Sequence, residues 1–223
     1  MPLFTAQKIL FDLDGTLVDT AADLHAATNH TLLSIGRAPV SLDQVRHMTG
    51  YGALKLIELG LEATGGTRDL DMETLRHTFL AFYRANICDK SQVYSGGIEV
   101  LECLKSQGFQ MAVCTNKPHA MAVPLLEEIG IAHYFDVITG GDSFPFKKPD
   151  ARHIINTIRM LTGSGAALMV GDSSPDILGA QAANIPVVAV NFGYPDVPVE
   201  THGPDAIISS LTELPALLAF SAS

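Results

Sequence analysis

The sequence predicts an α/β protein in which a Rossmann-like parallel sheet, covered by helices on both faces, carries an inserted small all-helical cap domain. From Val93 onward, short apolar strands alternate with helical patterns, and this alternation implies crossover connections and a parallel sheet. Strands such as Leu168-Met169-Val170 are continuously apolar, which is typical of burial on both faces. Residues from about 21 to 85 show only helical patterns. We therefore assign residues 1–18 and 90–223 to the sheet core and residues 19–89 to the cap.

The composition indicates a globular protein rather than a nucleic-acid-binding or membrane protein. Of the 223 residues, 47% are apolar and 17% are charged, and the formal net charge is −10. No cluster of Lys and Arg is present, so we expect no nucleic-acid partner. No apolar run is long enough to cross a membrane, and the first residues lack the pattern of a signal peptide. The three cysteines are widely spaced, which argues against a disulfide framework or a thiolate zinc site. We expect a cytoplasmic protein with no membrane partner, either a monomer or a homodimer.

The elements can be predicted in chain order. Lys8-Ile9-Leu10 is the first strand, and the hinges to the cap are expected at residues 15–19 and at Val93-Tyr94. Caps and glycine stops place the cap helices over residues 24–36, 41–48, 54–65 and 71–83. The remaining strands are expected at residues 109–114, 136–139, 167–170, 186–190 and 206–208, and the remaining helices at 95–108, 118–129, 150–161, 175–183 and 211–220.

Polar residues follow the main strands where each strand ends. Asp12 and Asp14 follow the first, Thr115-Asn116 and Asp172-Ser173 follow two later ones, and Lys147-Lys148 lies in the loop after the third. The carboxyl ends of parallel strands meet in one crevice, where ligands of open α/β sheets bind. The three carboxylates suit Mg²⁺, which prefers oxygen ligands. The hydroxyl, the amide and the ammonium suit a phosphate bound beside the metal.

The segment around Asp12 and Asp14 is the strongest single signal. Two carboxylates two residues apart would crowd like charges in a buried strand unless a cation compensates them. Gly15 suggests that the strand breaks there, so that Asp14 moves onto a loop while Asp12 stays at the strand tip. An ordinary strand followed by an Asp-Gly turn is the alternative, but such a turn does not require an acidic residue within the apolar run.

Four ordered motifs together resemble those of the haloacid dehalogenase superfamily of phosphohydrolases. They are Asp12-x-Asp14-Gly15-Thr16, Thr115 at a strand end, Lys148 before Pro149, and Gly171-Asp172 with Asp176. The helical insertion is similar to the small helical cap of that family. Within the superfamily, Thr115-Asn116-Lys117-Pro118, Gly140-Gly141-Asp142 and Gly171-Asp172-Ser173 resemble the phosphoglycolate phosphatases most.

The resemblance implies a role for each motif residue. Asp12 would be the nucleophile that forms an aspartyl-phosphate, and Asp14 the general acid and base, with its backbone carbonyl on the metal. Thr115 and the Asn116 backbone would bind phosphoryl oxygens. Lys148 would neutralise the nucleophile and the developing charge. Mg²⁺ would be held at Asp12, Asp14 and Asp172, with support from Asp176.

Each of these residues has a simpler interpretation when taken alone. Thr115-Asn116 could be a strand-to-loop cap, the two lysines could be solvated surface charges, and Asp176 could favour a helix N-terminus. Their occurrence together at successive strand ends favours the site, and Lys148 is preferred over Lys147 because it directly precedes a proline. Asp19 is expected to be a helix N-cap and Asp142 a structural or site-lining residue. Packing or surface positions are expected for His25, His30 and His133.

A break in the cap pattern at Thr49-Gly50-Tyr51-Gly52 indicates a loop. In capped members of the resembled family such a loop faces the active site, so Gly50, Tyr51 and Gly52 are candidates for substrate binding. Lys55, one turn further on, is a candidate partner for a substrate carboxylate. An ordinary turn between two helices is an equally good interpretation of this segment.

The function expected from these features is Mg²⁺-dependent hydrolysis of a small phosphorylated metabolite, with 2-phosphoglycolate as the first candidate. Another small phosphate ester or pyrophosphate is the nearest alternative. A phosphosugar mutase similar to β-phosphoglucomutase shares the same chemistry. A haloacid dehalogenase would not be expected to carry Asp14, and a non-catalytic metal-binding regulator would not be expected to retain Asp12, Asp14, Lys148 and Asp172 together.

Overall fold

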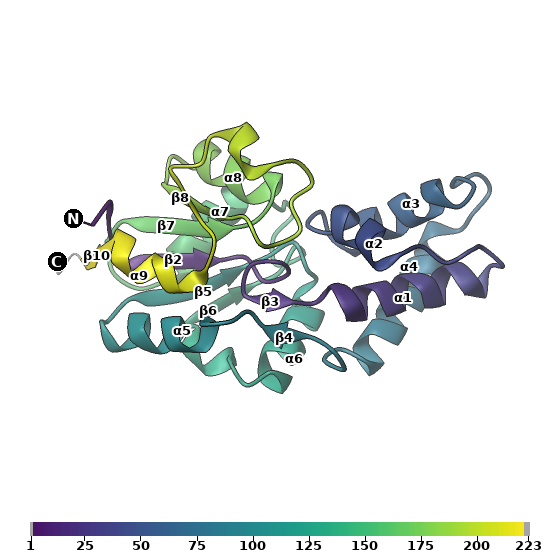
Figure 1. Cartoon of the computed structure of the whole chain (residues 1–223), viewed down its shortest axis with the longest axis horizontal. Helices are drawn as coiled ribbons and strands as arrows, with labels where there is room; N and C mark the ends of the chain where they lie inside the picture. Colours follow the sequence, from purple (N-terminus) through teal and green to yellow (C-terminus); the bar gives the residue numbers. More distant parts are fainter. Residues whose placement is uncertain (1, 221–223) are drawn as a thin grey trace.

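The centre of the protein is a six-stranded parallel sheet with the strand order β6-β5-β2-β7-β8-β9 (Figure 1). The computed structural model describes residues 2–220. The strand β2 lies in the interior of the sheet, and all four of its residues, Lys8 to Phe11, are buried there. It pairs with β5 on one side and β7 on the other, so that Phe11 lies beside Val113 and Val170. The sheet strands are β2 Lys8–Phe11, β5 Gln110–Cys114, β6 Val137–Thr139, β7 Ala167–Gly171, β8 Val187–Val190 and β9 Ala206–Ile208.

Helices cover both faces of the sheet, as the sequence predicts (Figure 1). Ile9 and Phe11 point to one face and Leu10 to the other, because side chains alternate along a strand. The first face packs against α5, α6 and α9, and the second against α7 and α8. These helices are α5 Gly97–Ser106, α6 His119–Glu128, α7 Ala151–Met160, α8 Ser174–Ala182 and α9 Leu214–Leu217, with 3₁₀ turns at Ala132–Tyr134, Val199–His202 and Leu211–Glu213.

Four helices that lie in the sequence between the strands β3 and β4 form a bundle with its own apolar cluster. The helices are α1 Ala21–Ser34, α2 Leu42–Met48, α3 Ala53–Ala63 and α4 Met72–Ala85. Their starts follow the predicted caps: Ser41 forms a capping box with Gln44, and Asp71 accepts hydrogen bonds from two backbone N–H groups at the start of α4. The bundle lies beside the carboxyl-end edge of the sheet (Figure 1). Its status as a separate cap domain with limits at residues 19 and 89 stays a prediction.

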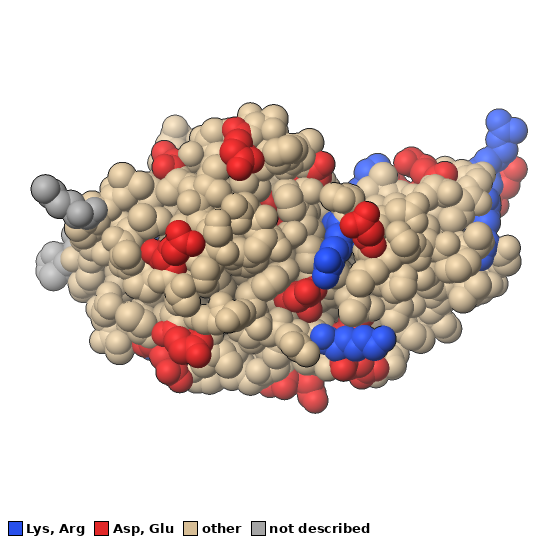
Figure 2. All heavy atoms as spheres, in the orientation of Figure 1, with Lys and Arg blue, Asp and Glu red and all other residues tan. Residues whose placement is uncertain are grey.

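The two predicted hinges lie side by side. Strands β3 Val18–Asp19 and β4 Gln92–Val93 form a two-stranded antiparallel ribbon that joins the bundle to the sheet. Asp23 on α1 reinforces this connection, because its carboxylate accepts hydrogen bonds from the backbone N–H groups of Lys90 and Ser91. Figure 2 shows that, on this face, basic side chains gather at this junction and on the bundle, whereas acidic side chains dominate over the sheet.

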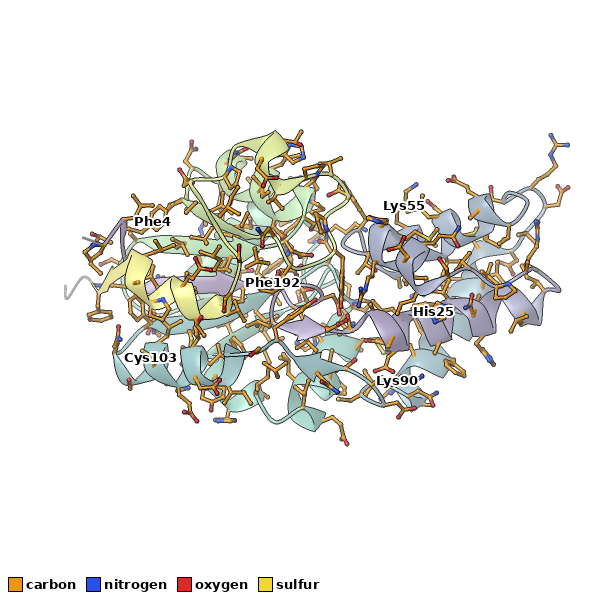
Figure 3. The ribbon with its side chains drawn as sticks, in the orientation of Figure 1. Phe4, His25, Lys55, Lys90, Cys103 and Phe192 are labelled. Atoms are coloured by element: carbon orange, nitrogen blue, oxygen red, sulfur yellow. The ribbon has the colours of Figure 1, made fainter. Side chains whose placement is uncertain are left out.

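The chain ends differ from the sequence-based expectation. The predicted helix over residues 211–220 is wrong in its last part, because α9 ends at Leu217 and β10 Leu218–Phe220 follows. This strand pairs in parallel with β1 Phe4–Ala6, which the sequence analysis missed. Both strands are three residues long, too short to show a period of two, and Phe4 lies at the end of the core far from the bundle (Figure 3). Among residues 2–220, no helix is long and apolar enough to cross a membrane. The cytoplasmic location and the oligomeric state stay predictions.

Candidate active site

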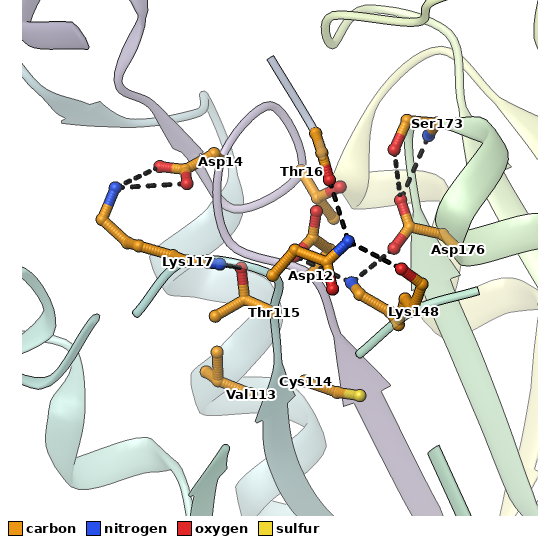
Figure 4. Close-up of polar contacts among 12 residues, drawn as sticks. Asp12, Asp14, Thr16, Val113, Cys114, Thr115, Lys117, Lys148, Ser173 and Asp176 are labelled. Carbon is orange, nitrogen blue, oxygen red and sulfur yellow. Dashed lines mark hydrogen bonds and ion pairs between the residues drawn. The ribbon is translucent and has the colours of Figure 1, made fainter. Parts of the chain in front are cut away.

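The carboxyl ends of three adjacent strands bring the predicted residues together (Figure 4). Asp12 follows β2, Thr115 follows β5 and Asp172 follows β7. The register places Phe11 beside both Val113 and Val170, so the residues after each strand meet at one edge. The loop between β6 and α7 adds Lys148 to the same group.

Lys148 is the cation at Asp12. Its side chain is 1% exposed, and its Nζ lies 3.0 Å from Asp12 Oδ1 and 2.5 Å from Asp176 Oδ1. Burial lowers the pKa of Lys148, but the carboxylates of Asp12 and Asp176 raise it more, so the ammonium stays charged. Lys147 is exposed and instead donates from Nζ to the backbone carbonyl of Tyr51 at 2.7 Å. The structure therefore places Lys148 and not Lys147 beside Asp12, as expected from the proline that follows it.

Burial and neighbouring charges shift the carboxylates of this group. Burial is the largest cause that raises the pKa of Asp12 to about 6; Lys148 opposes this rise, and Asp176 and Asp14 contribute to it. Burial also raises the pKa of Asp172 well above its ordinary value, with smaller contributions from Asp176 and Asp12. If all three carboxyls were ionised, they would carry more negative charge than Lys148 offsets, which is costly in a buried site and accounts for the raised pKa values.

The acidic group has the composition of a divalent-cation site. Oxygens of Asp12, Asp172 and Asp176 all lie within 4.8 Å of one another, and all three residues are buried. Asp176 is already occupied, since Oδ1 pairs with Lys148 and Oδ2 accepts from the backbone N–H groups of Asp172 and Ser173. Asp172 and Asp12 are thus the carboxylates best placed to face an ion. Hard oxygen donors with an excess of negative charge fit Mg²⁺.

The backbone around Asp172 is shaped to hold its carboxylate. Gly15 has a φ of +86°, and a Cβ at this position would lie 2.3 Å from Asp172 Oδ2. The same oxygen accepts from the backbone N–H of Tyr194 at 2.6 Å, and Oδ1 accepts from Thr16 Oγ1 at 3.1 Å. Only a glycine adopts this turn and permits this approach. The strand break predicted at Gly15 therefore also creates the space for the carboxylate of Asp172, which follows β7.

Asp14 is separated from the acidic group and has its own cation (Figure 4). Lys117 Nζ lies 2.8 Å from Asp14 Oδ1 and 3.1 Å from Oδ2, and Thr20 Oγ1 donates to Oδ1 at 2.7 Å. The turn at Gly15 directs the two aspartates of the motif to different partners, Lys148 for Asp12 and Lys117 for Asp14. Two carboxylates from one strand end therefore have different surroundings, which permits different tasks.

Thr115 and Asn116 help to organise the loops around the site. Thr115 Oγ1 accepts from the backbone N–H of Lys117 at 3.2 Å. The Asn116 side-chain amide donates to the backbone carbonyls of Lys148 at 3.0 Å and Gly50 at 3.1 Å. The Asn116 side chain thereby connects the lysine loop with the loop of the helical bundle, while Asn116 Oδ1 is buried without a hydrogen-bond partner among the described residues.

The loop of residues 49–52 contacts the sheet edge, but only some of its residues line the cavity there. Gly50 and Gly52 line a cavity shared with Asp14, Thr115 and Asn116. The Tyr51 hydroxyl instead donates to Asp196 Oδ2 at 2.7 Å, so its ring does not line that cavity. Lys55, which Figure 3 labels on the bundle, pairs with Glu58 at 3.2 Å and does not line the cavity either. The structure therefore does not support Lys55 as a carboxylate partner.

Lys117 and Tyr83 are site residues that the sequence analysis did not assign. Lys117 Nζ donates to the Tyr83 hydroxyl at 2.7 Å and lies 4.5 Å from the centre of that ring. Burial raises the pKa of Tyr83 to about 12, so the phenol stays neutral. The available signals were the position of Lys117 three residues after a strand end and the position of Tyr83 on the apolar face of its helix.

Of the minor sequence predictions, one is wrong and the others are confirmed. Asp19 is not the N-cap of α1, because Thr20 holds that position and Asp19 accepts from the Tyr194 hydroxyl. Asp142 is structural: it accepts from the His119 N–H at the start of α6 at 2.7 Å. The three remaining histidine predictions hold: His25, labelled in Figure 3, lies 2.9 Å from the Val40 carbonyl, while His30 and His133 are exposed beside aromatic rings.

Comparison with known proteins identifies the family. The sequence pattern of the haloacid dehalogenase-like hydrolases matches residues 9–190. The chain belongs to the haloacid dehalogenase-like hydrolase family. The match runs from β2 through β8 and therefore includes the helical bundle and all four motif segments. The resemblance predicted from those motifs is confirmed.

Relatives and solved structures agree with this assignment. The chain is 47% identical over 212 residues to the phosphoglycolate phosphatase of Agrobacterium fabrum, covering 93% of this chain and 91% of that protein. It is 38% identical to the phosphoglycolate phosphatase of Colwellia psychrerythraea, covering 96% and 97%. A crystal structure of a predicted phosphoglycolate phosphatase from Haemophilus somnus 129pt matches with a TM-score of 0.87 at 30% identity, covering 95% and 97%. The protein is therefore a hydrolase of this family, of the phosphatase branch that these relatives represent.

Proposed function

We propose that the protein is a Mg²⁺-dependent phosphomonoester hydrolase that acts through an aspartyl-phosphate on Asp12 and whose substrate is 2-phosphoglycolate. The observation that carries the chemistry is the separation of the two motif aspartates, each with its own buried lysine. A nucleophile and a proton donor perform different tasks, and separate partners let each carboxylate act on its own. The names of the relatives support the choice of substrate.

In the first half-reaction, Asp12 attacks the phosphorus atom. A bond forms between an Asp12 oxygen and phosphorus, and the bond between phosphorus and the ester oxygen breaks. Lys148, at 3.0 Å from Asp12, reduces the repulsion between the nucleophile and the phosphate. Asp14 donates its proton to the leaving alkoxide, so that glycolate leaves as the alcohol.

In the second half-reaction, Asp14 accepts a proton from water. The water oxygen bonds to phosphorus, and the bond between phosphorus and Asp12 breaks. Both aspartates return to their starting states, and the net reaction converts the ester and water into glycolate and phosphate. Phosphoryl oxygens would be held by Thr115, by the Asn116 backbone and by Lys148.

A divalent cation completes the charge balance of this scheme. Asp12, Asp172 and the backbone carbonyl of Asp14 would hold Mg²⁺, and Asp176 would support them. When bound, Mg²⁺ would neutralise charge on the phosphate that Asp12 attacks. The excess of carboxylates over ammonium groups in the buried acidic group supports this assignment.

The cavity beside Asp14 supports a small leaving group. It has a volume of about 30 Å³ and lies between the sheet edge and the bundle, with Leu56 and Phe79 among its apolar walls. So narrow a space favours a small leaving group, and the walls would exclude water from the reacting atoms.

A panel of phosphate esters with Mg²⁺ tests this proposal. We expect phosphate release from 2-phosphoglycolate with the highest kcat/KM, and loss of release after Asp12→Asn or chelation of the metal. A higher kcat/KM for another small ester or for pyrophosphate would overturn the choice of substrate but would agree with the proposed chemistry. Turnover that depends on a sugar bisphosphate primer would instead indicate a phosphosugar mutase. No release from any ester would overturn the chemistry.

A further inference from the structure

The cavity beside Asp14 contains one cationic side chain among the described residues. Asp14, Thr115 and Asn116 line it on the catalytic side, and apolar residues of the bundle line most of the rest. Lys117 reaches the same cavity from the segment that follows β5. A carboxylate that entered this space would meet one ammonium group between the polar catalytic side and the apolar walls of the bundle, where burial strengthens an ion pair.

The Lys117 ammonium is held between the two sides of the cavity. Its side chain is 3% exposed, and it contacts both oxygens of Asp14 at the sheet edge and the Tyr83 hydroxyl on α4. Because the Tyr83 oxygen accepts from Lys117, the Tyr83 O–H remains able to donate. An ammonium and a phenol hydroxyl beside one another form a two-donor site for a carboxylate.

Other basic residues near the junction are engaged elsewhere. Lys55 pairs with Glu58, Lys147 binds the Tyr51 carbonyl, and Arg46 lies 3.5 Å from Asp19. None of the three lines the cavity. Among the described residues, Lys117 is therefore the basic side chain that an anionic group in this cavity would meet.

We propose that Lys117 and the Tyr83 hydroxyl recognise a carboxylate on the leaving group, and that this carboxylate replaces Asp14 as the partner of the Lys117 ammonium. This inference rests on the proposed function, in which Asp14 protonates the leaving oxygen. While Asp14 is paired with Lys117 and Thr20, both lysine contacts occupy its oxygens. The incoming carboxylate frees an Asp14 oxygen for the ester oxygen. A phosphate ester without a carboxylate leaves the pair intact, so selectivity arises in kcat as well as in KM.

The test compares paired substrates that differ in the carboxylate. One pair is 2-phosphoglycolate and ethyl phosphate, and the other is 2-phospholactate and isopropyl phosphate. Steady-state kinetics on wild type, Lys117→Met, Tyr83→Phe and the control Lys55→Met gives kcat/KM for each ester. We expect Lys117→Met to lower the ratio of carboxylate to neutral ester by about 10- to 100-fold, and Tyr83→Phe by roughly 3- to 10-fold. Lys55→Met should leave the ratio unchanged.

A binding measurement separates recognition from turnover. With Asp12→Asn as the background, calorimetric titration of each ester reports affinity without hydrolysis. Adding Lys117→Met should weaken binding of the carboxylate esters by about 10-fold or more and leave the neutral esters within about twofold. Thermal unfolding confirms that each variant is folded. If Lys117→Met does not fold, the same binding comparison is made with Tyr83→Phe.

Equal losses for carboxylate and neutral esters would overturn the inference and assign Lys117 a role in positioning Asp14 only. A wild-type enzyme with no preference for either carboxylate ester over its neutral partner would also overturn it. Failure of the substrate proposal looks different: 2-phosphoglycolate would be a poor substrate, while the 2-phospholactate pair still responded to Lys117→Met.

Discussion

Replacing Lys148 by Met should destabilise the metal-free protein more than any exposed lysine substitution. The side chain is 1% exposed and its ammonium neutralises two carboxylates, of Asp12 and of Asp176, which are themselves 5% and 1% exposed. Removal of one member of a buried ion pair costs about 3–5 kcal/mol, because the remaining charge is left without a partner. For a chain of this length, this loss lowers Tm by about 10 °C.

The assay is urea unfolding with a chelator present, followed by circular dichroism. Lys147→Met is the matched control, because the neighbouring side chain is exposed and should change the free energy of unfolding by about 0.5 kcal/mol or less. Mg²⁺ should recover part of the lost stability, since a cation that binds only the folded state stabilises it. A loss below about 1 kcal/mol, or a loss equal to that of the control, would refute the electrostatic account of the site.

Three further predictions concern catalysis, pH and the backbone. Asp14→Asn should lower kcat by about 10²- to 10⁴-fold, measured as steady-state phosphate release, because the amide cannot supply the proton; an unchanged kcat would exclude Asp14 as the acid. Burial, then Lys148, lowers the pKa of His153 to about 4 from an ordinary 6.5. As pH falls, the unfolded state therefore binds the proton before the folded state does, and about 2–3 kcal/mol of unfolding free energy should be lost between pH 6.5 and pH 4. Urea unfolding of His153→Gln should show a flatter dependence of this free energy on pH over that range. An unchanged slope would contradict the lowered pKa of His153. Gly15→Ala should raise the Mg²⁺ concentration needed for half-maximal activity, because its Cβ would meet Asp172 Oδ2 at 2.3 Å; an unaltered Mg²⁺ dependence would show that this approach does not position Asp172.

Much of the fold follows from local patterns in the sequence. Continuous apolar strands such as Ala167–Gly171 can be buried only in a sheet covered on both faces, and the alternation with helices requires that sheet to be parallel. Parallel strands point their carboxyl ends the same way, so the residues after each strand had to meet. The meeting of Asp12 with Asp172 and Lys148, with Thr115 at the next strand end, could thus be predicted without coordinates.

The tertiary structure decided which of the gathered side chains contact one another. Asp12 and Asp14 are two residues apart, yet the turn at Gly15 gives them different lysines, and no sequence pattern states where a side chain points after such a turn. Tyr83 lies on the apolar face of its helix like any core residue, and only the packing of α4 beside the sheet edge brings its hydroxyl to Lys117. The pairing of β1 with β10 joins the two ends of the chain, a contact between distant segments that are individually too short to show a strand pattern. Local chemistry in the sequence thus determined which residues gather at the sheet edge, whereas the pairing of Asp12 with Lys148 and of Asp14 with Lys117 depended on contacts between elements far apart in the chain.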